Sequence, residues 1–352
     1  MIEVLTSGVA LGVHIPGLLL AHRLRERGVP ADVSVIERLL PEHKLATTAQ
    51  MKWAFHEDFR LAKAGHRLAT EPHAVADEQA VDALFARWNA EGVTKFVVFS
   101  GFWLPILDRY LAGRPARPEV VLCHIDATYS PSFRKAAGGQ VPYTDVFLVG
   151  GGTAGIPCSV PVSAEPPVAW VDRASRLYVH GGGWGMGTYR DRIGELTAAG
   201  IALDVLAYRE SDVDEAPGVR HFMMDPAWHP WLDNGFPPFG QVVDGVAEFT
   251  RGTTCPGSFA LTRAARGMVS KPGGGTCLDS LWAATPLLFL EPLGSAEKRN
   301  GDVWRELGFG MPYEQWRDTG FAEQPLADMH AALVRARPHI PDYSEILAKE
   351  HG

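Results

Sequence analysis

The chain has 352 residues, of which 46% are apolar and 21% charged, a composition typical of a globular protein with sizeable buried cores and not of a disordered chain. This length predicts two domains of roughly 150 residues each. The formal net charge of −8 argues against nucleic acid and anionic lipid as partners, because both attract basic surfaces. The four cysteines include no C-x-x-C pair, which favours a reducing cytoplasm over a disulfide framework or a zinc site.

Strand-like and helix-like runs alternate from the N-terminus onwards. "IEVLTSG" (2–8) has the composition of a strand and "IPGLLLAHRLRERG" (15–28) the pattern of a helix, so the apolar start predicts neither a signal peptide nor a membrane span. Three later runs predict further strands of a parallel sheet: "TKFVVFSG" (94–101), "EVVLCHI" (119–125) and "YTDVFLVGG" (143–151).

A second set of elements follows a break rich in proline. We place an interdomain linker at residues 155–170, because Pro, Ser and small residues interrupt both periodicities there. Beyond it the alternation restarts. The predicted strands are 176–183, 201–208, 267–274 and 286–292, and the predicted helices are 188–200, 257–265 and 276–285.

This repetition predicts an α/β fold in which two Rossmann-like domains face a cleft. We assign residues 1–160 to an N-terminal domain on the acceptor side and residues 161–325 to a C-terminal domain that binds the nucleotide. Residues 326–352 form a C-terminal helical segment.

Residues 221–240, "HFMMDPAWHPWLDNGFPPFG", break the alternation with aromatic residues and prolines, and predict a long loop or insertion. We expect its large aromatic residues to form the small core of that loop; the alternative is that they cover a nucleoside base or shape an acceptor pocket. These residues are Trp228, Trp231, Phe236 and Phe239. Prolines interrupt the stretch that holds His221, Asp225 and His229, so no metal site is predicted here.

Three consecutive glycines, Gly273 to Gly275, stand between the strand that ends near Lys271 and a helix predicted to start at Thr276. Bare backbone at a helix N-terminus presents free N–H groups and the positive end of the helix dipole, so this loop suits a diphosphate. For Thr276 alone we favour a capping box with Asp279, which is compatible with that site. Asp279 is also placed to accept hydrogen bonds from a ribose diol.

Residues 269–301 resemble the C-terminal domain of the GT-B glycosyltransferases grouped with monogalactosyldiacylglycerol synthases, processive diacylglycerol glucosyltransferases and the peptidoglycan-precursor N-acetylglucosaminyltransferase. The matching motifs are "KPGGGTCLD", "AATP" and "GSAEKRNG". The resemblance implies a donor diphosphate on the backbone of the glycine loop, with Asp279 in place of the family's Glu on the ribose. The nucleotide-sugar residues that it implies are Lys271, Gly273, Gly274, Gly275, Thr276, Asp279, Glu297, Lys298 and Asn300.

The resemblance extends more weakly over the rest of the chain. "LGVHIPGLLLAHRL" is similar to the family's G-x-G-H loop, with Gly12 and His14 matching and the residues beside them departing. "HGGGWGMG" (180–187) is similar to the glycine turn that opens the second domain; there Gly183 contributes to the diphosphate site, and His180 is expected to be a strand-end packing residue. Ala296 replaces a Gln that contacts donor-sugar hydroxyls, so the donor sugar stays open. In this fold the C-terminal segment packs back on the first domain.

Sugar transfer needs a base that takes the proton of an acceptor hydroxyl while a nucleoside diphosphate leaves. We choose His14, which the resemblance places on a loop across the cleft from the diphosphate; His124 and Asp126 are the alternatives at the end of another strand. N–H groups of the two glycine loops stabilise the leaving diphosphate, so the mechanism requires neither a metal nor a cofactor beyond the nucleotide-sugar co-substrate.

The sequence therefore predicts a cytoplasmic glycosyltransferase that moves a sugar from a nucleotide-sugar donor, UDP-linked by our choice, to a hydroxyl of a small soluble acceptor by inverting single displacement. No association with a membrane is expected, because the chain shows no basic amphipathic helix. Two alternatives stay open: another reaction on the same scaffold, such as nucleotide-sugar epimerisation, and a non-catalytic nucleotide-sugar-binding partner of another enzyme.

Overall fold

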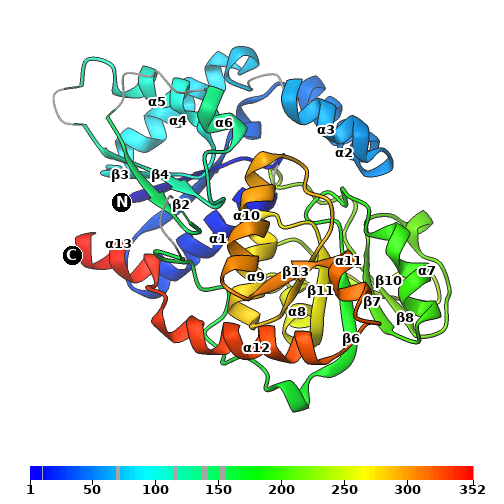
Figure 1. Cartoon of the computed structure of the whole chain (residues 1–352). Coiled ribbons are helices and arrows are strands. Elements are labelled where there is room, and N and C mark those ends of the chain that lie inside the picture. Colours follow the sequence, from blue (N-terminus) through cyan, green and yellow to red (C-terminus); the bar gives the residue numbers. More distant parts are fainter. Residues whose placement is uncertain (10, 69–71, 115–116, 136–141, 151–154, 352) are drawn as a thin grey trace.

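The computed structural model describes residues 1–9, 11–68, 72–114, 117–135, 142–150 and 155–351. Two separate β-sheets organise these residues, one in each half of the chain, and helices pack around both (Figure 1). The predicted α/β class with two Rossmann-like halves is confirmed. The domain boundaries that we assigned stay a prediction.

The first sheet has five parallel strands in the order β2-β1-β3-β4-β5. All residues of β1 and β3 are buried, as expected for parallel strands that helices cover on both faces. The strands are β1 (Ile2–Thr6), β2 (Ala31–Val35), β3 (Lys95–Val98), β4 (Glu119–His124) and β5 (Thr144–Phe147). Sequence reasoning found four of these and missed β2, because Asp32 and Ser34 interrupt its short apolar run. Residue 151 of the strand predicted at 143–151 lies outside the described residues.

The helices of the first half are α1 (Leu11–Glu26), α2 (Glu42–Glu57), α3 (Phe59–Leu68), α4 (Glu78–Ala90), α5 (Leu104–Leu111) and α6 (Pro131–Lys135). Helix α1 starts four residues earlier than its predicted run at 15–28, so Gly12 and His14 lie in its first turn and not on a loop. Helices α2 and α3 stand beside the first sheet, at the upper right of Figure 1.

The second sheet has eight strands in the order β10-β9-β8-β7-β6-β11-β12-β13. Six of them run parallel, and β9 and β10 form an antiparallel hairpin at one edge. The strands are β6 (Ala174–Val179), β7 (Ala202–Ala207), β8 (Val219–Met224), β9 (Phe239–Val243), β10 (Val246–Ala247), β11 (Ala265–Ser270), β12 (Leu287–Phe289) and β13 (Gly310–Pro312). The strands predicted around 176–183, 201–208, 267–274 and 286–292 are confirmed by β6, β7, β11 and β12.

The loop predicted at residues 221–240 is wrong at both ends. Strand β8 continues to Met224 and β9 begins at Phe239, so only the stretch between them is irregular. The turn after β9 has Asp244 and Gly245 at positive φ, which is the Asp-Gly turn that favours a two-residue hairpin. The Asp-Gly dipeptide is the feature of the sequence from which this hairpin could have been predicted.

The helices of the second half are α7 (Arg190–Ala198), α8 (Phe259–Ala264), α9 (Gly274–Ala283), α10 (Ser295–Glu306), α11 (Tyr313–Arg317), α12 (Gln324–Ala336) and α13 (Tyr343–His351). The chain end returns to the first half: α13 packs on α1, and Lys95 on β3 pairs with Glu350 at 2.8 Å (Figure 1). The backbone of Ser159, within the predicted linker, also pairs with the start of α13.

The two halves meet most closely where α1 and α9 cross. A Cβ added to Gly275 would lie 3.3 Å from the Cα of Gly12, so the two helix starts touch backbone to backbone. Further along, Leu278 and Ala283 of α9 belong to the same buried cluster as Leu19 of α1. This contact fixes the start of α9 against the first half.

Substitution of Arg23 tests whether its hydrogen bonds hold the predicted linker in place. Its guanidinium is buried, and it donates to the carbonyl oxygens of Pro161 at 3.1 Å and Val162 at 2.8 Å. Arg23→Met leaves both carbonyls unpaired and should lower the free energy of unfolding in urea by roughly 2–5 kcal/mol. Arg299→Met, which changes an exposed pair with Glu306, should change it by less than about 1 kcal/mol. An equal effect of the two substitutions would contradict this account of the linker.

Candidate functional site

A cavity of about 560 Å³ lies between the two halves and is lined by residues of both. On the first half its walls come from the segments after β1, β3 and β4, and on the second half from those after β6 and β11. Strands β6 and β11 are neighbours at the position where the strand order of the second sheet reverses. Ligands of open α/β sheets bind outside the carboxyl ends of the strands at such a position. The cavity therefore occupies the expected place for a ligand.

The structure brings most of the predicted nucleotide-sugar residues together around this cavity. Two glycine turns face each other there, one after β6 and one after β11. The lining residues among those predicted are Gly12, Asp126, Gly183, Lys271, Gly273, Gly274, Gly275, Thr276, Asp279 and Glu297.

Helix α9 begins at Gly274, two residues before the predicted start, and its N-cap is Gly273 in an extended conformation. Gly273 has no side chain to cap the helix, so the predicted Thr276–Asp279 capping box is wrong. Thr276 lies within the first turn, and its side chain is buried. Because Gly273 carries no capping side chain, the first turn presents backbone N–H groups at the cavity, and one of them, the N–H of Gly274, donates to the Asp126 carboxylate.

Lys271 places a positive charge between the two glycine turns. Its ammonium group lies within 2.8 Å of the Glu297 carboxylate, and a Cβ added to Gly182 would meet it at 3.3 Å. Glu297 also accepts a hydrogen bond from the N–H of Leu293 at 2.6 Å. A nearly buried cation beside bare backbone N–H groups is the arrangement that binds an anionic group in proteins.

Asn300 joins the two halves beside this cation. Its side chain is fully buried; its Nδ2 donates to Asp126 at 2.7 Å and to the carbonyl of Pro272 at 3.0 Å, while its Oδ1 accepts from the N–H of Ala127 at 2.8 Å. Asn300 does not line the cavity, so it positions Asp126 and does not present its own amide to a ligand. Burial raises the pKa of Asp126 to about 6.

Asp279 lies in the second turn of α9 and lines the cavity. Burial raises the pKa of its carboxyl group to about 7, and no charge partner offsets this effect. Such a group near neutrality holds or releases a proton at working pH, and in either state it hydrogen-bonds a hydroxyl.

Lys298 is the predicted site residue that the structure places elsewhere. It points outward from α10, is largely exposed, and pairs with Asp302 one turn later at 3.1 Å. One residue along a helix turns a side chain by about 100°, so Glu297 and Lys298 face different sides. The predicted contact of Lys298 with the sugar or phosphates is therefore wrong.

His14, our first choice as base, is fully buried beneath residues of the second half. Its Nδ1 pairs with the Thr6 hydroxyl at 3.0 Å, which itself donates to the carbonyl of Ser34, so Nδ1 carries the proton and Nε2 is left without one. Nε2 is buried and has no partner among the residues that the structure describes, and burial together with Arg38 lowers the pKa of His14 to about 3. His14 does not line the cavity.

The stretch between β8 and β9 forms the cover over His14. The ring of Trp228 is tilted by 39° to the imidazole, with ring centroids 6.4 Å apart, and Pro230 packs against Gly8. Arg38 of the first half fixes this stretch by donating to the carbonyl of Trp231 at 3.1 Å. Of the predicted aromatic residues, Trp228 and Phe236 are core residues, whereas Phe239 lines the cavity.

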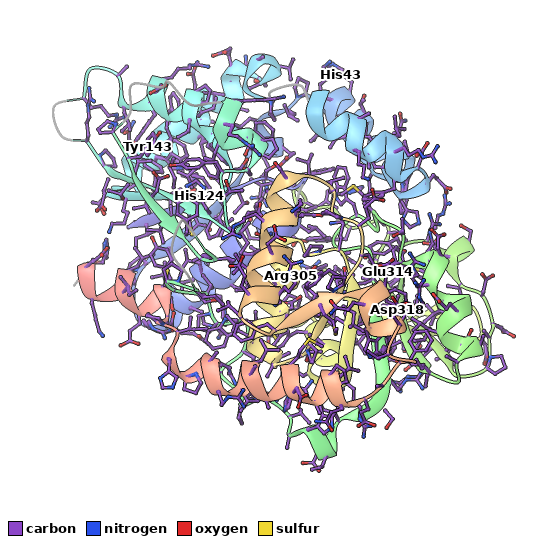
Figure 2. All side chains as sticks on the ribbon, in the orientation of Figure 1. His43, His124, Tyr143, Arg305, Glu314 and Asp318 are labelled. Carbon is purple, nitrogen blue, oxygen red and sulfur yellow. The ribbon has the colours of Figure 1, made fainter. Side chains whose placement is uncertain are left out.

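His124 is also a packed residue. Its Nε2–H donates to the Asp145 carboxylate at 2.7 Å, and its ring stacks on Phe147, with ring centroids 4.3 Å apart. Figure 2 labels it within the dense side-chain packing of the first half. Asp126 is thus the one predicted base that the structure brings to the cavity.

No protein-family profile matches this sequence, and no curated protein matches it either. Solved structures do match in fold over nearly the whole length of both chains. The spinosyn rhamnosyltransferase SpnG in complex with thymidine diphosphate superposes with a TM-score of 0.58 at 13% identity, covering 100% of each chain. MurG of Acinetobacter baumannii (TM-score 0.54, 12% identity) and the glycosyltransferase SnogD of Streptomyces nogalater (0.53, 16%) each cover 99% of this chain and 98% of their own.

The chain has the GT-B fold. The narrower resemblance to lipid-glycosylating GT-B enzymes stays a prediction. Within the described ranges no helix is long and apolar enough to cross a membrane. Those ranges also hold no group of three or more His, Cys, Asp or Glu side chains placed to share a metal ion.

Sequence reasoning missed one acidic residue of this GT-B site, Glu37. Its buried carboxylate accepts from the N–H groups of Gly8 at 2.6 Å and Val9 at 3.2 Å and from the Ser7 hydroxyl at 2.7 Å. It therefore holds the loop between β1 and α1 against the cavity. The signal was weak, because Glu37 follows β2, the strand that sequence reasoning missed.

Asp279 gives the site a pH dependence with a defined sign. Since its folded-state pKa of about 7 lies above the unfolded value of 3.8, the folded chain holds an extra proton between these pH values. Stability should therefore fall as pH rises from 4 to 7. Asp279→Asn removes the titrating group. The free energy of unfolding of this variant, relative to that of the wild type, should therefore increase by roughly 1 kcal/mol per pH unit between pH 4 and 7.

The measurement is urea unfolding of both chains at several pH values between 4 and 8. Asp318→Asn serves as the control, because Asp318 is exposed at the surface and pairs only with Arg317. A constant difference between Asp279→Asn and the wild type across this range would show that Asp279 keeps an ordinary pKa.

Proposed function

We propose that this protein is a glycosyltransferase that moves a sugar from a nucleotide-sugar donor to a hydroxyl group of an acceptor. The observation that carries the proposal is the nearly buried Lys271 ammonium, set between two glycine turns at the ligand position of a GT-B fold. The titles of similar structures support a nucleotide donor, since SpnG and SsfS6 are described in complex with thymidine diphosphate. We propose uridine or thymidine diphosphate as the nucleotide.

The donor side of the cavity supplies each contact that such a ligand needs. The N–H groups at the start of α9 and the turn at Gly183 hold the diphosphate, and Lys271 neutralises part of its charge. Asp279 holds the ribose hydroxyls. As the bond to the sugar breaks, these fixed donors stabilise the charge that grows on the leaving diphosphate, so the proposed step requires no metal.

We assign the proton transfer to Asp126. Its pKa of about 6 lies near working pH, which suits a general base, and it reaches the cavity from the first half. The acceptor oxygen attacks the anomeric carbon from the face opposite the diphosphate. A new carbon–oxygen bond forms, the proton passes to Asp126, and the nucleoside diphosphate departs, so the configuration inverts.

The acceptor wall of the cavity is largely apolar. Helix α2 and the segments before it and after α3 contribute aliphatic and aromatic side chains, among them Leu40, Met51, Phe55 and Val75. Apolar walls with a few polar groups bind small molecules by burying carbon surface. We propose a small acceptor that carries its reactive hydroxyl on an apolar frame.

Lys271 and Lys298 make a matched pair for testing the donor site. Lys271→Met should weaken binding of uridine or thymidine diphosphate by roughly 10- to 100-fold in calorimetry, because a hydrogen bond to a charged group is lost, and should leave uridine binding nearly unchanged. Lys298→Met removes the same charge from the outer face of α10 and should change neither affinity. Equal losses in both variants would show a general charge effect and contradict a diphosphate at Lys271.

The catalytic assignment is tested by Asp126→Asn beside His14→Ala. Asp126→Asn keeps the shape and the contact with Asn300 and should lower single-turnover transfer by roughly 10²–10⁴-fold, with donor affinity nearly unchanged. His14→Ala should keep most of the transfer rate once its lower stability is allowed for. A large loss of transfer rate in His14→Ala, with little loss in Asp126→Asn, would identify His14 as the base, as the sequence predicted.

The same assays separate the alternative functions. Donor interconversion without any acceptor would indicate an epimerase, and tight nucleotide binding with no turnover on any acceptor would indicate a binding partner of another enzyme. Product stereochemistry, determined by NMR of the new glycosidic bond, tests the inversion.

A further inference from the structure

The glycine turn after β6 is held by a histidine of the other half. Gly182 and Gly183 of this turn line the cavity, whereas Gly185 does not. The carbonyl oxygen of Gly185 faces His56 of α2, whose Nδ1 lies 3.0 Å away. A Cβ added to Gly185 would lie 2.4 Å from that nitrogen, so only a residue without a side chain lets the ring approach. His56 thus fastens the donor-side turn to helix α2, which also contributes Phe55 to the acceptor wall.

Both nitrogens of the His56 ring face groups that only accept hydrogen bonds. Nδ1 faces the carbonyl oxygen of Gly185, and Nε2 lies 2.9 Å from one carboxylate oxygen of Asp212 and 3.1 Å from the other. The side chain is fully buried, so water cannot replace either partner. A neutral imidazole carries one hydrogen and serves one of these acceptors, whereas the imidazolium ion serves both. The charged ring is therefore the form that satisfies this contact.

The groups around the ring are compatible with that charge. Burial by itself would raise the pKa of Asp212, but hydrogen bonds from His56 and from the N–H of Tyr208 lower it, so the carboxyl group is ionised. Tyr208, whose ring centroid lies 5.4 Å from that of His56, stays neutral because burial raises its pKa.

Two arginines stand beside the same contact. Arg190 of α7 donates to the carbonyl oxygen of His56 at 2.8 Å and lies 3.4 Å from Asp212, and Arg209 pairs with Glu57. The two arginines and the two carboxylates cancel, so these four groups do not oppose the imidazolium ion by a net charge. On the elements packed around the ring, the titratable and charged side chains among the described residues are Lys52, Glu57, Arg190, Tyr208, Arg209 and Asp212.

We propose that His56 in its doubly protonated form is a positioning residue that holds the glycine turn after β6 in the shape that receives the diphosphate. This role rests on the proposed donor site. When the ring loses its second proton, one nitrogen presents a lone pair to an acceptor, and one of the two hydrogen bonds is lost. The turn is then held less firmly. A histidine ordinarily changes charge between about pH 5 and 8, so donor affinity should fall as pH rises across this range.

Two glutamine substitutions on one helix test this role. His56→Gln keeps an amide donor for one acceptor but cannot change its charge, and His43→Gln makes the same change at the exposed start of α2 (Figure 2). In calorimetry with uridine or thymidine diphosphate, the wild type should bind more tightly than His56→Gln by roughly 5- to 50-fold at about pH 6. This ratio should decrease as pH is raised to about 8, and it cancels the titration of the phosphate and of other groups, which both chains share. His43→Gln should follow the wild type at every pH.

A third variant changes the charge beside the ring. Asp212→Asn keeps an acceptor oxygen for Nε2 but removes the negative charge that favours the imidazolium ion. Its diphosphate affinity should therefore begin to fall at a lower pH than that of the wild type. A purely structural role of this contact would lower the affinity without moving that pH.

Failure of the wild-type chain to bind either diphosphate at any pH would overturn the donor site and this role together. Diphosphate binding with a wild-type to His56→Gln ratio that does not change with pH would overturn the role of His56 alone. If His56→Gln does not fold, NMR of the ¹⁵N-histidine-labelled wild type without ligand decides. The ring of His56, assigned through its contact with Tyr208, should carry hydrogen on both nitrogens at about pH 6 and on one nitrogen at higher pH. A single hydrogen at about pH 6 overturns the proposal.

Discussion

The backbone contact between Gly12 and Gly275 is the constraint on which the rest of the site depends. Helices α1 and α9 follow strands of different sheets, and their first turns meet closely because Gly275 carries no Cβ. That contact brings the free N–H end of α9 opposite the loop after β1, and Asp126 against Gly274. A methyl group at Gly275 would lie 3.3 Å from the Gly12 Cα and push the halves apart at the cavity. The close approach of the two halves at the cavity thus depends on the missing side chain of Gly275.

The charges around Lys271 explain how an anion site stays stable without its ligand. Glu297 pairs with the ammonium at 2.8 Å, and Asp126 lies nearby with a raised pKa. A buried cation without a counter-charge costs several kcal/mol. The carboxylate of Glu297 offsets this cost at Lys271 when no ligand is bound. When a diphosphate pairs with Lys271 in place of Glu297, the carboxylate of Glu297 needs another hydrogen-bond partner. The N–H of Leu293 is already such a partner. The carboxylate of Glu297 therefore keeps one hydrogen-bond donor when a diphosphate replaces it beside Lys271.

The sequence predicted the sheets, the glycine loop and most donor-side residues because their signals are local. Parallel strands read as short apolar runs, and Gly273 to Gly275 stand directly before a helix. Contacts between distant segments left no such signal. Asn300 was predicted to contact the ligand, yet its partners Asp126 and Ala127 lie more than 170 positions away in the chain, and only the fold shows that it ties the halves together. The tautomer of His180 likewise depends on the bend that brings Gly182 back to its ring.

The covered state of His14 shows why a matching motif does not by itself locate a catalytic base. His14 matches the motif in sequence, and its Nε2 has the free lone pair that a base requires. The stretch after β8, which the resemblance did not describe, brings Trp228 over the ring and is fixed to the first half through Arg38. Desolvation then lowers the pKa of His14 to about 3, so the ring is a poor proton acceptor at neutral pH. Burial acts in the opposite direction on a carboxyl group, since it disfavours the charged form of either residue. The same loss of water that weakens His14 as a base therefore strengthens Asp126, whose pKa rises to about 6. In this chain, the stretch between β8 and β9 covers His14, and this is why we propose Asp126 as the proton acceptor.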